Sequence, residues 1–314
     1  MAIKDLFSKI LLTLACIHAM PVFAENLSVF ADLLVWQASQ ETSSSWASVA
    51  TSNANHTIQF KAPDISFHYN LGFRGGFTAE PKNFASSKFY WTYFQTHQDG
   101  QLKNQAQLVF PEFFSGFVSG NFFFNGSIDW KLLMNMFDYE LGTKFTVGNA
   151  ITLRPNIGIK AGTINQAVNC LWLADIYTAT ESVKHNYFGV GPKFGIDSTW
   201  LIFKNLHVFG DFSAALMYGR WRIKDIYSRP YAAGGLVQPA NITTSLDKCY
   251  LGTIVLDYFM GIEYVHKGRS NVALKIGYEM QFWANQLRIP TFQQLPLRGD
   301  LTFQGATCRV IIDL

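Results

Sequence analysis

Residues 151–162 read ITLRPNIGIKAG and alternate apolar and polar side chains without a break. The side chains of a β-strand point in turn to opposite faces, so this stretch predicts a strand with one apolar face and one polar face. The polar face carries Arg154 and Lys160 among threonine, asparagine and glycine residues. Such a face is typical of the lumen side of a transmembrane β-barrel, whose other face meets lipid.

The same pattern recurs in four more segments of 11 or 12 residues, at 66–77, 187–197, 254–264 and 272–283. Their lengths suit a bilayer, which a tilted strand crosses in about 9–11 residues. In the segment 66–77, Phe67 is expected to face lipid, whereas Ser66 and His68 are expected to face the lumen. Weaker alternation predicts five further strands, at 26–36, 86–97, 136–147, 206–222 and 300–314.

The segments between these strands differ in length in a regular way. Short turns are predicted at 79–85, 148–149, 204–205 and 267–271. Long, irregular loops are predicted at 37–64, 98–135, 164–186, 223–249 and 285–299. Outer-membrane barrels have short periplasmic turns and long outer loops. We therefore expect an all-β, antiparallel transmembrane barrel of about ten strands with both termini in the periplasm. Twelve strands are the alternative if 98–135 contains one more hairpin.

The last predicted strand has a register problem. Counting back from Leu314 places Cys308 on the lipid face, whereas counting forward places Leu301 and Phe303 there. A β-bulge near Gly305 would reconcile the two registers.

The N-terminus has the features of a secretory signal. Lys4 and Lys9 precede an apolar run, and Val22-Phe23-Ala24 forms a small-x-small cleavage site. We expect residues 1–24 to be a signal peptide and 25–314 to be one outer-membrane barrel domain. Sec-type export and cleavage would then deliver the protein to the outer membrane of a Gram-negative cell.

The composition also suits a lipid environment. Charged residues make up 15% of the chain, against roughly 25% in soluble domains, and aromatic residues make up 16%. The chain has a net charge of +3, and its sequence shows no concentrated basic face of the kind that binds nucleic acid. Tryptophans near the strand ends suit interfacial girdles, with core packing as the alternative for some of them. They are Trp36, Trp91, Trp130, Trp172, Trp200, Trp221 and Trp283.

Three cysteines follow the predicted cleavage site, so they cannot all pair within one chain. Cys170 and Cys249 fall in or beside predicted outer loops, and a bridge between them is one alternative. Cys308 is expected to be a small buried or lipid-facing residue. An intermolecular bridge stays open as well.

Charged residues on the predicted lumen faces are the candidate pore-lining set. They are Arg74, Asp138, Glu140, Arg154, Lys160, Lys193, Asp257, Glu263, Lys275 and Glu279. One interpretation is a network of ion pairs that holds the wall. The other is a constriction whose charge sets ion selectivity. The residues alone do not decide between them.

No set of residues predicts an enzyme, a cofactor site or a metal site. The glycines at 189, 191 and 195 lack dinucleotide-loop spacing and precede no helix. The histidines form no ligand-spaced group. We therefore expect no catalytic residues, no cofactor and no metal.

Several strings, in order, resemble those of the Legionella-type major outer membrane protein family, which also has relatives among chlamydia-related bacteria. They are LVWQA (34–38), LRPNIG (153–158), FGVGPKFG (188–195), ALMYG (215–219), GYEMQFW (277–283) and GDLTFQG (299–305). The resemblance covers about 34–314 and implies an abundant, pore-forming barrel with a role in cell-surface structure. One departure is Leu314, since such barrels usually end in Phe.

The leading hypothesis is a porin-like, pore-forming protein with a structural role in the envelope. The alternative is a closed barrel that acts as a surface adhesin or receptor through its outer loops. Expected partners are outer-membrane lipid and lipopolysaccharide, small hydrophilic solutes or ions, and a second copy of the chain. A host surface is the partner that the alternative would require.

Overall fold

We describe the protein from a computed structural model. It describes residues 26–41, 46–52, 58–61, 65–82, 85–103, 108–111, 123–230, 239–268, 270–289 and 297–314. The predicted signal peptide lies outside these residues. Within them, no helix is long and apolar enough to cross a membrane.

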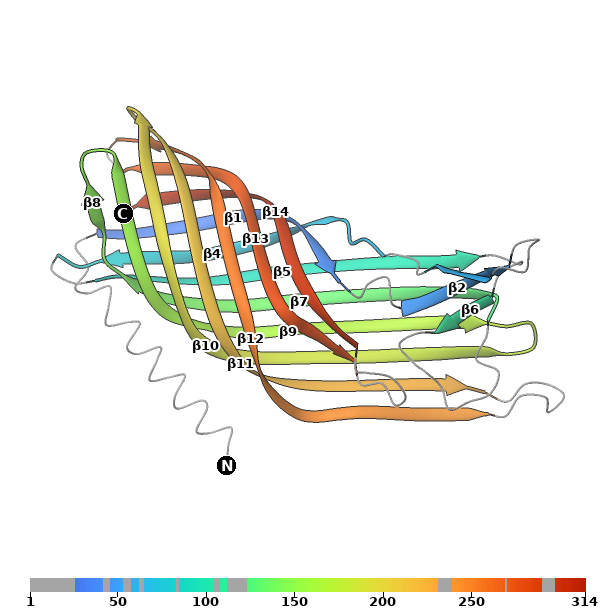
Figure 1. Cartoon of the computed structure of the whole chain (residues 1–314). Coiled ribbons are helices and arrows are strands. Elements are labelled where there is room, and N and C mark those ends of the chain that lie inside the picture. Colours follow the sequence, from blue (N-terminus) through green and yellow to red (C-terminus); the bar gives the residue numbers. More distant parts are fainter. Residues whose placement is uncertain are drawn as a thin grey trace.

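Ten long antiparallel strands close into a barrel (Figure 1). They are β1 Asn26–Gln40, β4 Tyr69–Glu80, β5 Ser86–Lys103, β7 Asn125–Gly142, β9 Ile151–Leu173, β10 Thr178–Phe203, β11 Leu206–Arg229, β12 Ala240–His266, β13 Val272–Ile289 and β14 Leu297–Asp313. Each strand pairs with two neighbours, and β1 closes the ring between β4 and β14. The predicted ten-stranded antiparallel barrel is confirmed.

Four short strands lie outside this ring. β2 Ala47–Ser52 pairs with β3 Ile58–Lys61 and with β6 Leu108–Pro111 in a separate small sheet. Figure 1 places β2 and β6 at the end of the barrel opposite the C-terminus. β8 Phe145–Val147 pairs with the first residues of β9. Because β6 pairs with β2 and not with the wall, the twelve-strand alternative is wrong.

The predicted alternation holds in four of the five strongest segments. In β9, Ile157 and Ile159 are exposed on the outer wall, whereas Arg154 and Lys160 are buried inside. The segment 66–77 differs at its start, because β4 begins only at Tyr69. Phe67 is buried and meets the ring of Trp130, so its assignment to lipid is wrong. Ser66 and His68 are exposed and precede the strand, so they do not face the lumen.

The strands are much longer than predicted, and the long loops are correspondingly shorter. β9 ends at Leu173 and β10 starts at Thr178, so most of 164–186 is a regular hairpin and not a loop. The ends of 98–135, 223–249 and 285–299 are also strand. On β10 the outward residues from Thr178 to Asn186 are polar, whereas those from Phe188 to Ile196 are apolar. The barrel therefore continues beyond its apolar belt by about 30 Å of strand.

The four predicted short turns lie together at the other end. β10 and β11 are joined by Lys204-Asn205, where Lys204 has a φ of 44°. The outer ends of β10 and β11 lie on the opposite side of the belt, with the small sheet. We call the turn end periplasmic and the extended end outer, as in other barrels of this kind.

The last strand needs no bulge. β14 pairs in unbroken register with β1 from Leu301 to Asp313, and Leu301 and Phe303 are 0% exposed inside the barrel. Their predicted lipid-facing placement is therefore wrong. Gly305 has a φ of 155°, and a Cβ there would lie 2.1 Å from the Val35 carbonyl oxygen. Only glycine fits this close approach of β14 to β1.

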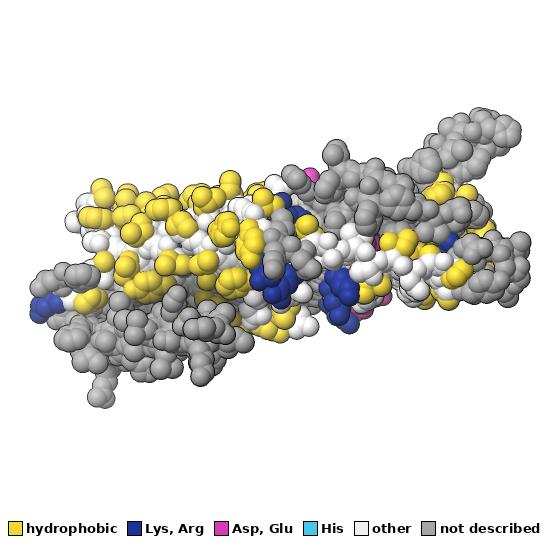
Figure 2. All heavy atoms as spheres, turned by 90° about the horizontal axis from the view of Figure 1, so that it is seen from below, with side chains coloured by type: hydrophobic (Ala, Val, Ile, Leu, Met, Phe, Trp, Pro, Cys, Tyr) yellow, Lys and Arg dark blue, Asp and Glu magenta, His cyan; other side chains and the backbone are white. Residues whose placement is uncertain are grey.

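An apolar belt surrounds one half of the barrel. Figure 2 shows hydrophobic side chains over this half and mixed, mostly uncharged surface beyond it. Phe188, Leu216 and Ile262 are each more than half exposed on the belt. Such a surface is stable only against lipid or another apolar partner.

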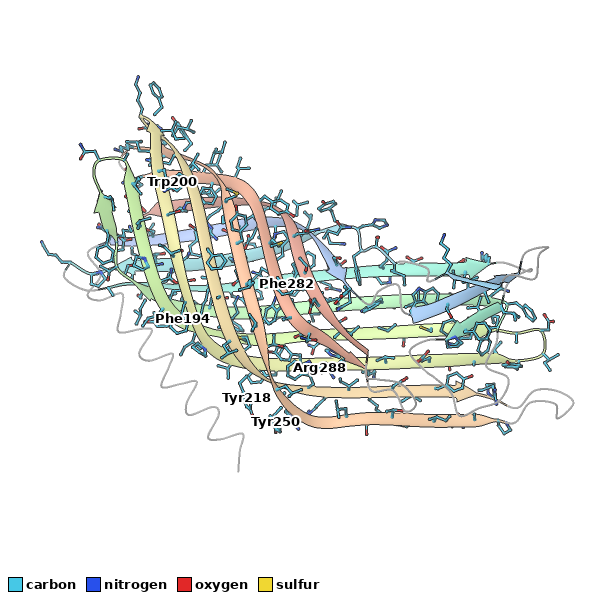
Figure 3. The ribbon with its side chains drawn as sticks, viewed as in Figure 1. Phe194, Trp200, Tyr218, Tyr250, Phe282 and Arg288 are labelled. Atoms are coloured by element: carbon cyan, nitrogen blue, oxygen red, sulfur yellow. The ribbon has the colours of Figure 1, made fainter. Side chains whose placement is uncertain are left out.

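Most of the predicted tryptophan girdle is instead inside the barrel. Only Trp200 and Trp91 face outward, and Figure 3 places Trp200 near the periplasmic end. The other five predicted girdle tryptophans are 0% exposed and point inward: Trp36, Trp130, Trp172, Trp221 and Trp283. Core packing, the alternative, therefore explains these five.

Candidate functional site

Arg74 is the hub of a buried network in the membrane half of the lumen. Its guanidinium lies 3.0 Å from an Asp32 carboxylate oxygen and 2.7 Å from one of Glu279. Asp32 also accepts two hydrogen bonds from Arg309, both 2.8 Å long. Alternation on β1, β4, β13 and β14 turns these four side chains inward, and the register places Asp32 directly opposite both Arg74 and Arg309.

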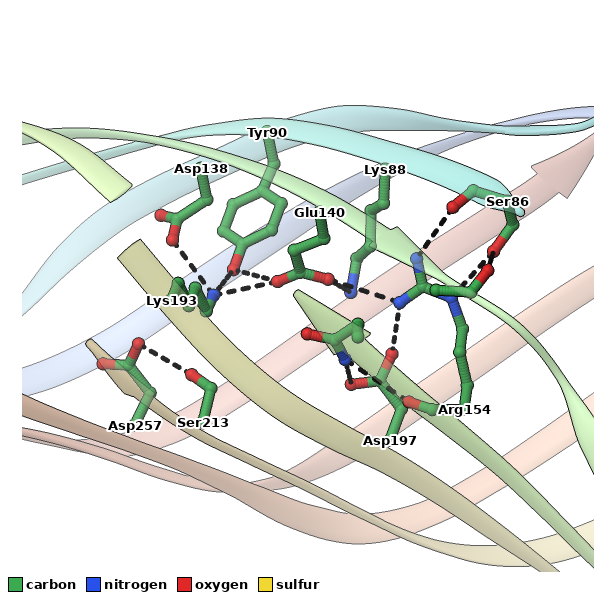
Figure 4. A network of polar contacts seen from close by, with 12 residues as sticks. Ser86, Lys88, Tyr90, Asp138, Glu140, Arg154, Lys193, Asp197, Ser213 and Asp257 are labelled. Atoms are coloured by element: carbon green, nitrogen blue, oxygen red, sulfur yellow. Dashed lines mark hydrogen bonds and ion pairs between the residues drawn. The ribbon is translucent and has the colours of Figure 1, made fainter. Parts of the chain in front are cut away.

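Lys193 is the second hub (Figure 4). Its Nζ lies 3.0 Å from Asp138 and 2.8 Å from Glu140. Asp138 also pairs with Lys160, and Glu140 with Arg154, at 3.2 and 3.3 Å. Two carboxylates on one β7 face thus share cations from β9 and β10.

Tyr90 joins the two hubs. Its hydroxyl donates to Glu140 over 2.9 Å, and the Arg74 guanidinium lies 5.6 Å from the centre of its ring. On the other side, Ser213 of β11 donates to Asp257 over 3.1 Å, and Asp257 pairs with Lys160. Every one of the ten ring strands therefore contributes a polar side chain to one network across the lumen.

The charges in this network balance. We call it the charged centre, and it contains six basic and six acidic side chains: Arg74, Lys88, Arg154, Lys160, Lys193, Arg309, Asp32, Asp138, Glu140, Asp197, Asp257 and Glu279. Asp138 and Lys160 are 1% exposed and Lys193 is 2% exposed. Buried charges are stable only when they are paired, and here each is.

All ten predicted pore-lining residues face the lumen. Eight belong to the charged centre, whereas Lys275 and Glu263 form a separate pair, 3.7 Å apart. Their role in lining a conducting pore stays a prediction. The candidate pore-lining set did not include Asp32, Lys88, Tyr90, Asp197 and Arg309. Asp32 and Arg309 interrupt apolar runs at inward positions, and this signal would have identified them.

Aromatic side chains fill the lumen on the outer side of the charged centre. Trp36, Phe94 and Phe303 pack with ring centres 5.5–6.3 Å apart. Tyr187 contacts Trp221 and Trp283 in the same way, at 4.5 and 6.3 Å. Toward the outer end, Trp46 from the segment before β2 stacks on Trp172 at 5.4 Å. This aromatic packing inside the barrel resembles the hydrophobic core of a soluble protein.

Two polar cavities remain on the periplasmic side. One, of about 520 Å³, lies in the periplasmic mouth and is lined by residues that include Lys88, Arg309, Lys275 and Asp211. A smaller one of about 50 Å³ lies against Arg74, Lys193 and Glu279. The periplasmic mouth therefore contains open space up to the charged centre.

A separate cluster of buried titratable side chains lies in the outer extension. Glu181 and Asp225 are 1% and 3% exposed, and each has one carboxylate oxygen without a hydrogen-bond partner. Burial raises the pKa of Asp225 to about 7. Burial and the nearby Asp225 carboxylate raise the pKa of Glu181 well above its usual value. Burial lowers the pKa of His185, a neighbour on β10, to about 4.

These acids predict a pH dependence. Between about pH 4 and pH 7 the folded chain holds a proton on Asp225 that the unfolded chain has released, so this residue lowers stability as pH rises. Asp225→Asn should therefore stabilise the barrel at pH 8 and leave it unchanged at pH 4, as measured by unfolding in urea. Asp99→Asn, which changes an exposed acid on the outer wall of β5, is the control. Equal stability of Asp225→Asn and wild type at both pH values would contradict the prediction.

Metal and disulfide sites are absent from the described residues. They contain no group of three or more His, Cys, Asp or Glu side chains that could hold a metal ion. Cys170 is a free, buried thiol, so the bridge to Cys249 is not formed. Cys308 is free and faces the outer wall.

A closed ten-stranded barrel with an apolar belt and a polar lumen defines the class of outer-membrane β-barrel proteins. A model of the family described as Legionella pneumophila major outer membrane protein precursor matches residues 19–312. The chain belongs to this family and is an outer-membrane protein.

The solved structures that match the chain are only distantly similar to it. The outer membrane protease OmpT from Escherichia coli has a TM-score of 0.44 and 7% identity, covering 92% of this chain and 96% of that one. The Pseudomonas putida toluene transporter TodX has a TM-score of 0.26 and 9% identity, covering 92% and 89%. No curated protein matches the sequence.

Proposed function

We propose that the protein is a closed outer-membrane barrel with a structural role in the envelope, and that its outer extension serves as a contact surface for an adhesin or receptor role. The observation that carries this proposal is the charged centre, to which all ten strands contribute. An open aqueous pore would leave its lining side chains in contact with water. Asp138, Lys160 and Lys193 are instead 1–2% exposed in the membrane half of the lumen.

The aromatic packing supports the same proposal. A solute that passed the charged centre would next meet Trp36, Phe94 and Phe303, which are all 0% exposed. Hydrophobic constrictions of this kind exclude water and stop conduction. The small sheet of β2, β3 and β6 and the stacked Trp46 and Trp172 add a further layer at the outer end.

The outer extension supports the contact role. Because β9 to β12 continue as regular strands beyond the belt, they raise the outer loops well above the lipid surface. Loops held on a rigid scaffold are the usual place for binding residues. Sec-type export with cleavage after Ala24 would place this extension outside the cell.

A gated pore is the second candidate, and the cavity of about 520 Å³ at the periplasmic mouth favours it. The cavity extends to Lys88 and Arg309 at the edge of the charged centre. Rearrangement of the ion pairs and of the aromatic layer would then be needed to open a path. The balanced charge of the centre implies weak selectivity between anions and cations.

Swelling of proteoliposomes in a small sugar tests the closed state. Vesicles that contain the refolded protein should swell no faster than protein-free vesicles, because the charged centre and the buried aromatic side chains occupy the described lumen. The comparison needs an open porin reconstituted at the same protein density as a positive control. Swelling at a rate close to that control would replace the closed barrel with the porin-like function.

A further inference from the structure

Four basic side chains gather on the outer wall where β10 and β11 leave the belt. On β11, Arg220, Arg222 and Lys224 point outward, while Trp221 and Ile223 between them point inward. Lys184 of β10 adds a fourth outward cation. Figure 2 shows Lys and Arg side chains gathered at the boundary between the hydrophobic half and the less apolar half. We call Lys184, Arg220, Arg222 and Lys224 the basic band.

The register brings these charges close together. Lys184 lies directly opposite Lys224, and Arg222 lies opposite Asn186. Like charges directly opposite on neighbouring strands have Cβ atoms about 5 Å apart and destabilise a sheet. Along β11 the successive outward cations are about 7 Å apart. The arrangement therefore carries an electrostatic cost that a bound anion would remove.

No described side chain neutralises the basic band. Among the described residues, no carboxylate lies within ion-pair distance of any of its four side chains, and the Nε of Arg220 is buried without an acceptor. The nearest acids along these strands, Glu181 and Asp225, point into the lumen. Among the described side chains, the four positive charges of the band therefore have no carboxylate partner on the outer wall.

The position of the basic band relative to the apolar belt restricts the class of ligand that it could bind. Directly below the band, Tyr218 is 61% exposed and stacks on Tyr250, with ring centres 6.1 Å apart. Figure 3 places both tyrosines where the strands pass from the belt to the extension. Arg220 also lies over the Tyr250 ring, at 5.9 Å. Tyrosines at this height mark the level of lipid headgroups.

We propose that the basic band binds the phosphate groups of an outer-leaflet lipid. Arginine can hold a phosphate through two parallel hydrogen bonds, and lysine adds charge without a fixed geometry. The acyl chains of the same lipid would lie against Leu216, Phe188 and the tyrosine pair below. This binding does not depend on whether the lumen conducts.

The test is a titration of the refolded full chain, in micelles of an uncharged detergent, with bisphosphorylated lipid A. Bound lipid is counted by native mass spectrometry. Arg222→Gln/Lys224→Gln should bind about 25-fold more weakly than wild type, since each basic residue near an anionic surface contributes about fivefold. Lys204→Gln/Lys267→Gln removes the same charge at the periplasmic turns and should bind like wild type. Lipid A without phosphates should bind all three proteins equally weakly.

Two results would overturn the proposal. One is equal binding of phosphorylated lipid A by both double variants. The other is complete displacement of the lipid by an equal concentration of inorganic phosphate, which would indicate a general anion site. Heat-modifiability on a gel checks folding first. If the Arg222/Lys224 variant does not fold, Lys184→Gln carries the test, with about fivefold weaker binding expected.

Discussion

Arg74→Met should lower the free energy of unfolding of the barrel by about 3–5 kcal/mol, the usual cost of removing one partner of a buried ion pair. Arg74 is the cation that pairs with Glu279 in the described part of the chain, and it also pairs with Asp32. Without it, the Glu279 carboxylate keeps a hydrogen bond from Thr307 but has no positive partner. Equilibrium unfolding in urea, followed by tryptophan fluorescence in lipid vesicles, measures the change.

The double variant Arg74→Met/Glu279→Met separates lost charge pairing from lost packing. It removes the pair as a unit, while Asp32 keeps both of its hydrogen bonds from Arg309. Replacement of a whole buried pair by apolar residues is often neutral, so the double variant should be more stable than the single one. Lys267→Gln, which changes an exposed lysine at the turn between β12 and β13, should change stability by less than about 0.5 kcal/mol. A double variant less stable than Arg74→Met would show that the pairing is not what holds the wall.

Ile276→Arg should impair assembly, because a positive charge on the lipid face near the bilayer centre costs about 2–4 kcal/mol. Ile276 is 49% exposed on β13, within the apolar belt. The adjacent Lys275 points inward and pairs with Glu263 near the periplasmic mouth. Lys275→Gln should therefore leave a folded barrel.

Both variants are refolded in the same lipid, and the folded fraction is read from heat-modifiability on a gel. Normal assembly of Ile276→Arg together with failure of Lys275→Gln would reverse the inside and outside faces of β13.

The membrane half of the barrel could be predicted from the sequence because one rule governs it. Lipid requires apolar residues at every second position, so Arg154, Lys160 and Lys193 were placed in the lumen from alternation alone. The same rule would have placed Asp32 and Arg309 there. Their neighbours Leu33 and Val310 are outward and apolar.

The outer half could not be predicted in the same way, because there the outer wall is polar and the lumen is apolar, the reverse of the membrane half. Beyond the belt the outer wall meets water, as at Lys184 and Asn186, while the lumen is apolar, as at Val183 and Tyr187. The alternation continues there, but the apolar residues face the lumen and the polar residues face outward. This reversal explains why Leu301 and Phe303 were assigned to lipid, and why five tryptophans of the lumen were assigned to girdles.

The ion-pair partners within the charged centre could not be predicted from the sequence either. Which cation meets which carboxylate depends on register and on contacts across the lumen. Arg74 and Glu279 are 205 residues apart in the chain and lie on strands that are not neighbours. Alternation gives the face of a residue but not its partner.

Conductance of the wild-type protein in a planar lipid bilayer tests the closed lumen most directly, because ions are smaller than any sugar. The refolded full chain is inserted into a neutral bilayer bathed in concentrated potassium chloride, and an open porin at matched density shows that insertion can be detected. A lumen filled by the charged centre and by Trp36, Phe94 and Phe303 predicts insertion without conductance steps. A steady conductance with every insertion event would contradict the closed barrel and establish an open pore.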